Sequence, residues 1–156
     1  MKNCTVQQLT ANDLSLMRQL NALFAAAFVD EQSYASTPPS DAYLTKVLEQ
    51  THVIALVALV DGQVTGGLVA YELPKLEQQR SEIYIYDLAV AEGHRRHGVG
   101  TKLILHLRTL AAARGAWVVY VQADYGDGPA IALYEKLGSR EEVLHFDIEV
   151  TRALSR

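Results

Sequence analysis

Residues 92–102 read EGHRRHGVGTK and combine two arginines, two histidines and two closely spaced glycines in one short segment. The segment follows the strand-like run YIYDLAV and precedes KLILHLRTLAAARG, which has helical periodicity. A helix start presents unpaired backbone N–H groups and a partial positive charge, and glycines let the chain approach an anion closely. The pattern predicts a site for a phosphate-bearing ligand. Its candidate residues are Arg95, Arg96, His97, Gly98, Val99, Gly100 and Thr101.

Two better-known phosphate loops do not fit this segment. Gly93 and Gly98 have the spacing of a Walker A loop, but Val99 stands where that loop needs a lysine. Gly98 and Gly100 lack the third glycine of a dinucleotide fingerprint, because Leu103 occupies its place. The segment therefore predicts a phosphate site of a different kind.

The remaining pattern is R-x-x-G-x-G at residues 95–100, directly after a strand that ends Leu88-Ala89-Val90. It resembles motif A of the GCN5-related N-acetyltransferase (GNAT) superfamily, in which this loop wraps the pyrophosphate of acetyl-CoA with backbone N–H groups. The resemblance implies that acetyl-CoA contacts the loop and the end of that strand. A solvated basic helix start is the alternative interpretation.

A second motif, ALYEKLG at residues 132–138, resembles motif B of the same superfamily. In that motif a helix lies beside the acyl chain, and its tyrosine points at the thioester sulfur. Tyr134 matches this tyrosine, and the likeness extends the cofactor contacts to Asp127 and Ala130. Otherwise Tyr134 is an amphipathic tyrosine that packs near Ala130 and Leu137.

Longer segments narrow the resemblance. SEIYIYDLAV, YVQADYGDGPAIALYEKLG and REEVLHFDIEV are similar to class I aminoglycoside 3-N-acetyltransferases, and PKLEQQR extends the likeness upstream. The resemblance implies transfer of an acetyl group from acetyl-CoA to the 3-amino group of a deoxystreptamine ring, and it suggests a homodimer. Two alternatives stay open: an acetyltransferase for a polyamine or peptide amine, and a module that binds acetyl-CoA without turning it over.

Acyl transfer from a thioester needs a neutral amine, stabilisation of the carbonyl oxygen and a proton for the leaving thiolate. The Val90 N–H is the candidate for the oxygen, and Tyr134 for the proton. For the amine we favour Asp87 as base or anchor. Strict alternation places Asp87 on the face of Ile83 and Ile85, where it is either re-aimed by a bulge or desolvated. A structural aspartate bonded to nearby backbone is the alternative.

Carboxylates and aromatic rings on loops and strand ends are also expected to bind an acceptor that carries ammonium groups. The connection VDEQSYASTPPS, the strand at 81–90, the turn DYGDG and the tail supply them. The candidate acceptor contacts are Glu31, Tyr34, Glu82, Tyr84, Asp87, Asp124, Tyr125 and Asp147. The plainer interpretation is that the turn residues only make the turn and that the tail charges are solvated.

The bulk composition restricts the partners. Among the 156 residues, 14 Lys and Arg stand against 18 Asp and Glu, which gives a net charge of −4 and favours cationic ligands over nucleic acid or anionic membrane. Cys4 is the one cysteine, so no internal disulfide and no zinc spacing exist, and no metal is expected. No apolar run reaches membrane-spanning length, and the start MKNCTVQQLTAND lacks the apolar segment of a signal peptide, so we expect a cytoplasmic protein.

The order of expected elements predicts an α+β fold in one domain, residues 1–156. A strand at 4–9 precedes a helix capped by Thr10 or Asn12, and Ser40 caps a second helix. Asp61-Gly62 joins a hairpin whose second strand ends at Pro74. The expected sheet is mixed and mostly antiparallel, with about four helices, splayed between strands at 81–90 and 116–123. The tail at 140–150 alternates like one or two further strands.

Overall fold

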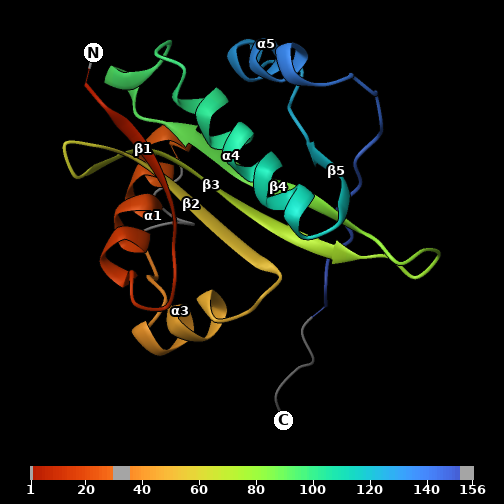
Figure 1. The fold of residues 1–156 in the computed structure, drawn as a ribbon, viewed down its shortest axis with the longest axis horizontal. Coiled ribbons are helices and arrows are strands. Elements are labelled where there is room, and N and C mark those ends of the chain that lie inside the picture. Colours follow the sequence, from red (N-terminus) through yellow and green to blue (C-terminus); the bar gives the residue numbers. More distant parts are fainter. Residues whose placement is uncertain (1, 30–35, 152–156) are drawn as a thin grey trace. The chain divides into compact units, whose positions relative to one another are not determined.

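A computed structural model describes residues 2–29 and 36–151 of the chain (Figure 1). These residues form two compact units, Met1–Ala123 and Asp124–Arg156. The single domain expected for residues 1–156 remains a prediction. The candidate acceptor residues Glu31 and Tyr34 lie outside the described residues.

The first unit is built on a five-stranded sheet in the order β1-β2-β3-β4-β5. Neighbouring strands are antiparallel except β4 and β5, which run parallel, so the predicted mixed and mostly antiparallel sheet is confirmed. The parallel pair is joined by α4, as a crossover between parallel strands requires. The strands are β1 Cys4–Gln8, β2 Val53–Val60, β3 Gln63–Pro74, β4 Ser81–Val90 and β5 Ala116–Val121.

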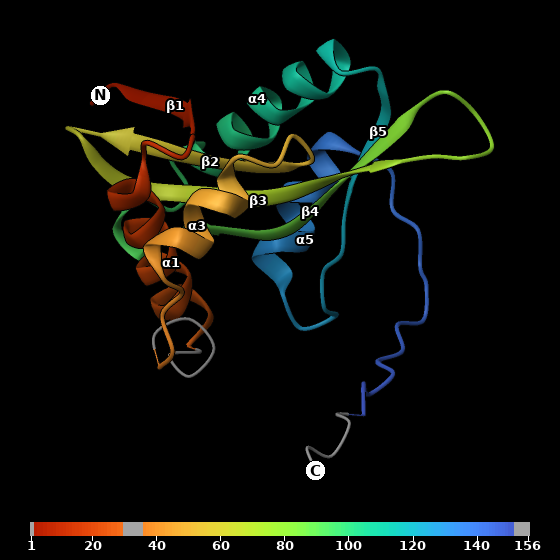
Figure 2. The ribbon, with the colours of Figure 1, turned by 90° about the horizontal axis from the view of Figure 1, so that it is seen from below.

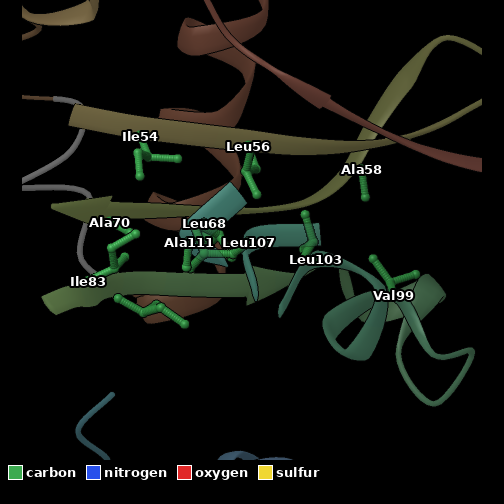
Figure 3. Close-up of a cluster of buried hydrophobic side chains, with 11 residues drawn as sticks. Ile54, Leu56, Ala58, Leu68, Ala70, Ile83, Val99, Leu103, Leu107 and Ala111 are labelled. Carbon is green, nitrogen blue, oxygen red and sulfur yellow. The ribbon is translucent and has the colours of Figure 1, made fainter. Parts of the chain in front are cut away.

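Helices cover both faces of this sheet (Figure 2). The helices α1 (Leu14–Phe28) and α3 (Asp41–Leu48) lie on one face, and α4 (Val99–Ala113) lies on the other. A cluster of buried hydrophobic side chains lies between the sheet and the helices on each face. The α4 face is filled by Ile54, Leu56, Ala58, Leu68, Ala70, Ile83, Ile85, Val99, Leu103, Leu107 and Ala111 (Figure 3). The α1 face is filled by Leu9, Met17, Leu20, Phe24, Leu44, Ala55, Val57 and Ala89.

The helix caps were predicted with mixed success. Ser40 caps α3 as expected, because its hydroxyl accepts a hydrogen bond from the Tyr43 N–H at 3.1 Å. The prediction that Thr10 or Asn12 caps α1 is wrong, since Asp13 occupies the N-cap position. The Asp13 carboxylate instead accepts bonds from the backbone N–H and the hydroxyl of Thr10, at 2.8 and 3.0 Å. This local bond draws Thr10 into the turn before the helix.

The hairpin turn between β2 and β3 agrees with the sequence prediction. Asp61 and Gly62 have φ angles of 53° and 77°, the left-handed conformations that a tight two-residue turn requires. Pro74 is the last residue of β3, also as predicted. The turn therefore joins β2 to β3 as an antiparallel pair, with Val60 opposite Gln63.

The second unit contains the helix α5 (Gly128–Leu137), with Pro129 in its first turn and Gly138 immediately after its last residue. The strands predicted for residues 140–150 are wrong, because the structure assigns no helix or strand to residues 139–151. Val143, Leu144, Phe146 and Ile148 are at least 68% exposed. Alternation makes a strand only where a neighbouring strand accepts its hydrogen bonds, and no such pairing is formed along this segment. Within the described chain, no helix has the length and apolarity to cross a bilayer.

A polar network ties the end of α4 to the sheet. Glu72 accepts hydrogen bonds from the Ser81 hydroxyl at 2.6 Å and from Arg114 Nη1 at 2.9 Å, and Arg114 also donates to the Thr51 carbonyl oxygen. Burial opposes the charged form, but these two donors outweigh it and lower the pKa of Glu72. A lowered folded-state pKa stabilises the fold above the ordinary carboxyl pKa, and this stabilisation is lost as pH falls through the folded value.

We expect Glu72→Gln to lower the free energy of unfolding at pH 7 by about 1 to 2 kcal/mol, because hydrogen bonds to a charged group are lost. Urea unfolding at pH 7 and below pH 4 measures the effect, and the difference from wild type should shrink at the lower pH. Glu77→Gln is the control, since Glu77 is exposed beside Lys75 and Arg80 and should leave stability near wild type. A pH-independent difference for Glu72→Gln would contradict the linkage.

Candidate functional site

Strands β4 and β5 part halfway along β4. Their parallel pairing begins at Ser81 with Ala116 and ends at Ile85 with Val121. Beyond Ile85, the described residues of β4 have no partner in β5, while their pairing with β3 continues to Val90. The predicted splay between these strands is confirmed, and it leaves one edge of residues 86–90 open.

The backbone of Val90 faces this open edge. The Ala91 N–H donates to the Thr65 carbonyl oxygen of β3 at 2.8 Å. Because successive N–H groups of a strand point to opposite sides, the Val90 N–H points away from β3. Arg95 Nε donates to the Val90 carbonyl oxygen at 3.1 Å, which fixes the loop after β4 to the same edge. A backbone donor thus points into the space where the two strands have separated.

The start of α4 lies directly after this loop. A short 3-10 helix, Glu92–His94, precedes it, and Gly98 caps α4 with a φ of 79°. The first bond within the helix runs from the Lys102 N–H to the Gly98 carbonyl oxygen at 3.0 Å, so the N–H groups of Val99, Gly100 and Thr101 have no acceptor within the helix. Arg95, Arg96, His97 and Gly98 are exposed around it. These donors and charges fit a pyrophosphate.

We expect Gly98→Ala to weaken acetyl-CoA binding several-fold, because a Cβ strains the left-handed conformation that turns the loop into α4. Calorimetric titration with acetyl-CoA measures the change. Gly93→Ala is the matched control in the same loop, since its added Cβ meets no atom within 4 Å and its φ is not in the left-handed region. Equal affinity for both variants would contradict a binding role for the loop geometry.

A bulge in β4 corrects the strict alternation predicted for this strand. Val69 pairs with Asp87, whereas the next residue of β3, Ala70, pairs with Ile85, so Tyr86 is an extra residue without a partner in β3. The bulge reverses the facing of every later residue. Leu88 and Val90 therefore pack against the α4-side core beside Ile83 and Ile85, and Ala89 packs on the α1 side.

Asp87 consequently leaves the isoleucine face. Its partner Val69 packs against the α1-side core, and cross-strand partners share a face. After burial, the negative charge of Asp87 is a further cause that raises the pKa of both Tyr71 and Tyr84. The position of Asp87 on the face of Ile83 and Ile85 is thus wrong, and the bulge that re-aims it is present in β4. The role of its carboxylate remains a prediction.

Four tyrosines on this face form a chain of ring contacts, and we call Tyr71, Tyr84, Tyr86 and Tyr120 the tyrosine face. Tyr84 stacks on Tyr120 with ring centroids 4.8 Å apart, and its hydroxyl donates to Gln122 Oε1 at 2.9 Å. Glu82 lies along the same face. Its carboxylate is 3.7 Å from Lys75 Nζ, and its charge, after burial, raises the pKa of Tyr120.

Sequence reasoning had selected Tyr84, Glu82 and Asp87 for this site but missed four other residues. They are Tyr71, Tyr86, Tyr120 and Gln122. The three tyrosines come from three strands and meet through register, because Tyr71 and Tyr120 both pair with Tyr84, and Gln122 directly follows β5. The signal that could have found them is the recurrence of tyrosine at one parity in three neighbouring strands. Pairing these strands correctly requires knowledge of the bulge.

The second unit holds the remaining predicted residues. Burial, followed by the charge of Asp127, raises the pKa of Tyr134 to about 12. Asp127 caps α5, since its carboxylate accepts from the Ala130 N–H at 3.3 Å. Asp124 and Tyr125 are exposed in the turn before it, and the Asp124 carbonyl oxygen accepts from the Asp127 N–H.

Asp147 is exposed and lies 2.9 Å from the His145 ring. In residues 2–29 and 36–151, no group of three or more His, Cys, Asp or Glu side chains is arranged to hold a metal ion.

The fold is that of an acyl-transferring family. The model of the Acetyltransferase (GNAT) family matches residues 17–139, and the chain belongs to this family. The structure of an aminoglycoside acetyltransferase from an uncultured soil metagenomic sample is 56% identical and covers 96% of this chain and 99% of its own, with a TM-score of 0.94.

Two further comparisons differ in what they name. A second soil metagenomic aminoglycoside acetyltransferase, crystallised with sisomicin, is 32% identical over 95% of this chain and 97% of its own, with a TM-score of 0.89. An N-alpha-acetyltransferase of Sulfurisphaera tokodaii is 30% identical over 110 residues. The match spans 64% of this chain and 64% of that archaeal protein.

Proposed function

We propose that this protein transfers the acetyl group of acetyl-CoA to the 3-amino group of a deoxystreptamine aminoglycoside, by direct attack within a ternary complex. The observation that carries the proposal is the open edge of β4, where the Val90 N–H points into the split between strands immediately before the helix start that suits a pyrophosphate. For a thioester beside that edge, the Val90 N–H is a hydrogen-bond donor to the carbonyl oxygen, and the start of α4 is a site for the pyrophosphate of coenzyme A.

Each of three groups, the Asp87 carboxylate, the Val90 N–H and the Tyr134 hydroxyl, then has one role in the reaction. The acceptor nitrogen loses a proton to Asp87 and attacks the carbonyl carbon, and the Val90 N–H stabilises the negative charge that forms on the oxygen. The C–N bond forms and the C–S bond breaks. Tyr134 donates a hydrogen bond to the departing thiolate and keeps its own proton. The attacking nitrogen loses its second proton as the amide forms, and this proton passes to the sulfur, so the coenzyme leaves as the thiol.

Coenzyme A is assigned to residues of β4, of the loop that follows it and of the start of α5. Leu88, Ala89 and Val90 supply strand backbone for its pantetheine arm, and the loop from Arg95 to Thr101 holds its pyrophosphate. Asp127 and Ala130, at the start of α5, complete the predicted contacts. The donors available at Val99, Gly100 and Thr101 support this assignment.

The acceptor assignment is supported by charge and by the relatives. Asp87 and Glu82 bring negative charge to the tyrosine face, which suits a polycation. Glu31, Tyr34, Asp124, Tyr125 and Asp147 remain predicted contacts. The relatives named as aminoglycoside acetyltransferases match nearly the whole chain.

Acetylation of a peptide amino terminus is the second candidate, because the archaeal relative is an N-alpha-acetyltransferase. Thiol release by purified protein distinguishes the two when gentamicin, spermidine and short peptides are compared at equal concentration. We expect the highest kcat/KM for gentamicin, and NMR of the product to place the acetyl group on N3. A higher kcat/KM for peptides, or acetylation at another nitrogen, would overturn the respective part of the proposal.

A further inference from the structure

Tyr86 is the extra residue of the bulge, and its ring is both exposed and fixed in orientation. The residue is 64% exposed although it lies within β4. Tyr71 and Tyr84 contact it edge to face, with centroid distances of 6.0 and 5.7 Å and interplanar angles of 78° and 70°. Two edge contacts of this kind hold a ring at a set angle while leaving surface for a ligand.

The carboxylate of the neighbouring residue shares this surface. Asp87 acts electrostatically on Tyr71 and Tyr84, the same two rings that contact Tyr86. An apolar ring surface and an anion therefore stand side by side on one face of the sheet. A ligand that matches both has an ammonium group attached to a flat or chair-shaped ring, whereas a linear amine matches only the carboxylate.

The geometry points to Tyr86 as the residue that selects ring-bearing amines: its ring is the surface on which the aminocyclitol of the acceptor stacks while Asp87 takes the amine. This inference rests on the proposed function and adds a specificity-determining residue to it. It assigns Tyr86 to acceptor affinity and not to bond making, so its loss acts on KM and leaves kcat near wild type.

The test compares Tyr86→Leu and Tyr86→Phe by steady-state kinetics with gentamicin and by calorimetric titration of gentamicin onto the protein in the presence of coenzyme A. We expect Tyr86→Leu to raise KM and Kd about three- to tenfold, the range of a lost aromatic contact, and Tyr86→Phe to stay within about twofold. The inhibition constant of spermidine against gentamicin should be the same in wild type and in both variants.

Trp117→Leu is the matched control, since Trp117 is 54% exposed on β5 and stacks under Arg80 at 4.3 Å. Trp117 has no partner in β4, since it lies at the register shift near the start of the β4–β5 pairing, whereas Tyr86 follows the last pair, Ile85 with Val121. If Tyr86→Leu does not fold, Tyr86→Thr replaces it, because threonine suits a strand. We expect the same rise in KM and Kd for gentamicin in that variant.

The outcomes separate this inference from the proposed function. Unchanged gentamicin affinity in a folded Tyr86→Leu, or an equal loss of spermidine affinity, overturns the role of Tyr86 and leaves the activity standing. If the wild type binds gentamicin but does not acetylate it, the proposed activity is wrong, and the calorimetric Kd values still test the role of Tyr86. No gentamicin binding by the wild type overturns both.

Discussion

Asp87→Asn is expected to lower kcat for an aminoglycoside by about 10²- to 10⁴-fold, the range in which a positioned base contributes to proton transfer. The amide keeps the size and much of the hydrogen bonding of the carboxylate but cannot take a proton from the acceptor ammonium. Steady-state kinetics at saturating acetyl-CoA measures the effect. The dissociation constant of acetyl-CoA should not change, because Asp87 faces α1 whereas the anion site starts α4 on the opposite side of the sheet.

The same variant separates a base from an anchor. A base acts on kcat, whereas a carboxylate that only holds the ammonium acts on KM. Asp61→Asn is the matched control, since Asp61 lies in the β2–β3 turn, 2.8 Å from Lys2, and asparagine suits its left-handed conformation. Wild-type kcat and KM in Asp87→Asn would remove this residue from the mechanism and leave it as a structural aspartate.

The features predicted correctly from the sequence are those that short segments determine. Asp61-Gly62 and Ser40 were recognised because a turn or a cap depends on a few consecutive residues. The start of α4 was recognised for the same reason, since its glycines and preceding strand are contiguous. The cap of α1 failed narrowly: Asp13 and Thr10 are both good capping residues, and their mutual hydrogen bond decides between them.

The facing of Asp87 could not be predicted by alternation, because a bulge depends on how two strands pair. Nothing within SEIYIYDLAV marks Tyr86 as the extra residue, and the register of β3 against β4 determines it. The tyrosine face was missed for the same reason. The tail shows the converse error, since alternation from Val143 to Val150 predicts strands although no partner strand is formed there. In both places long-range pairing overrides the local pattern.

Tyr134→Phe is expected to lower kcat by about 10²-fold, near the lower end of the range for a positioned acid. The reason for the lower end is the pKa of Tyr134, which burial and Asp127 raise to about 12. A thiol has a pKa of about 8.5, so complete transfer of the phenol proton to a thiolate runs uphill by roughly 3.5 pK units, or about 5 kcal/mol. Tyr134 therefore acts as a neutral hydrogen-bond donor to the developing thiolate.

This role fixes the expected pH dependence. A phenol whose folded-state pKa is raised above 10 keeps its proton throughout the range from pH 6 to 9, so Tyr134 causes no titration there. The wild type and Tyr134→Phe should show the same pH profile of kcat, displaced downward in the variant, while calorimetry gives the same acetyl-CoA affinity. If the variant instead loses a basic limb that the wild type has between pH 7 and 9, Tyr134 ionises in that range and the neutral-donor mechanism is wrong. Unchanged kcat would assign the tyrosine to packing within α5 alone.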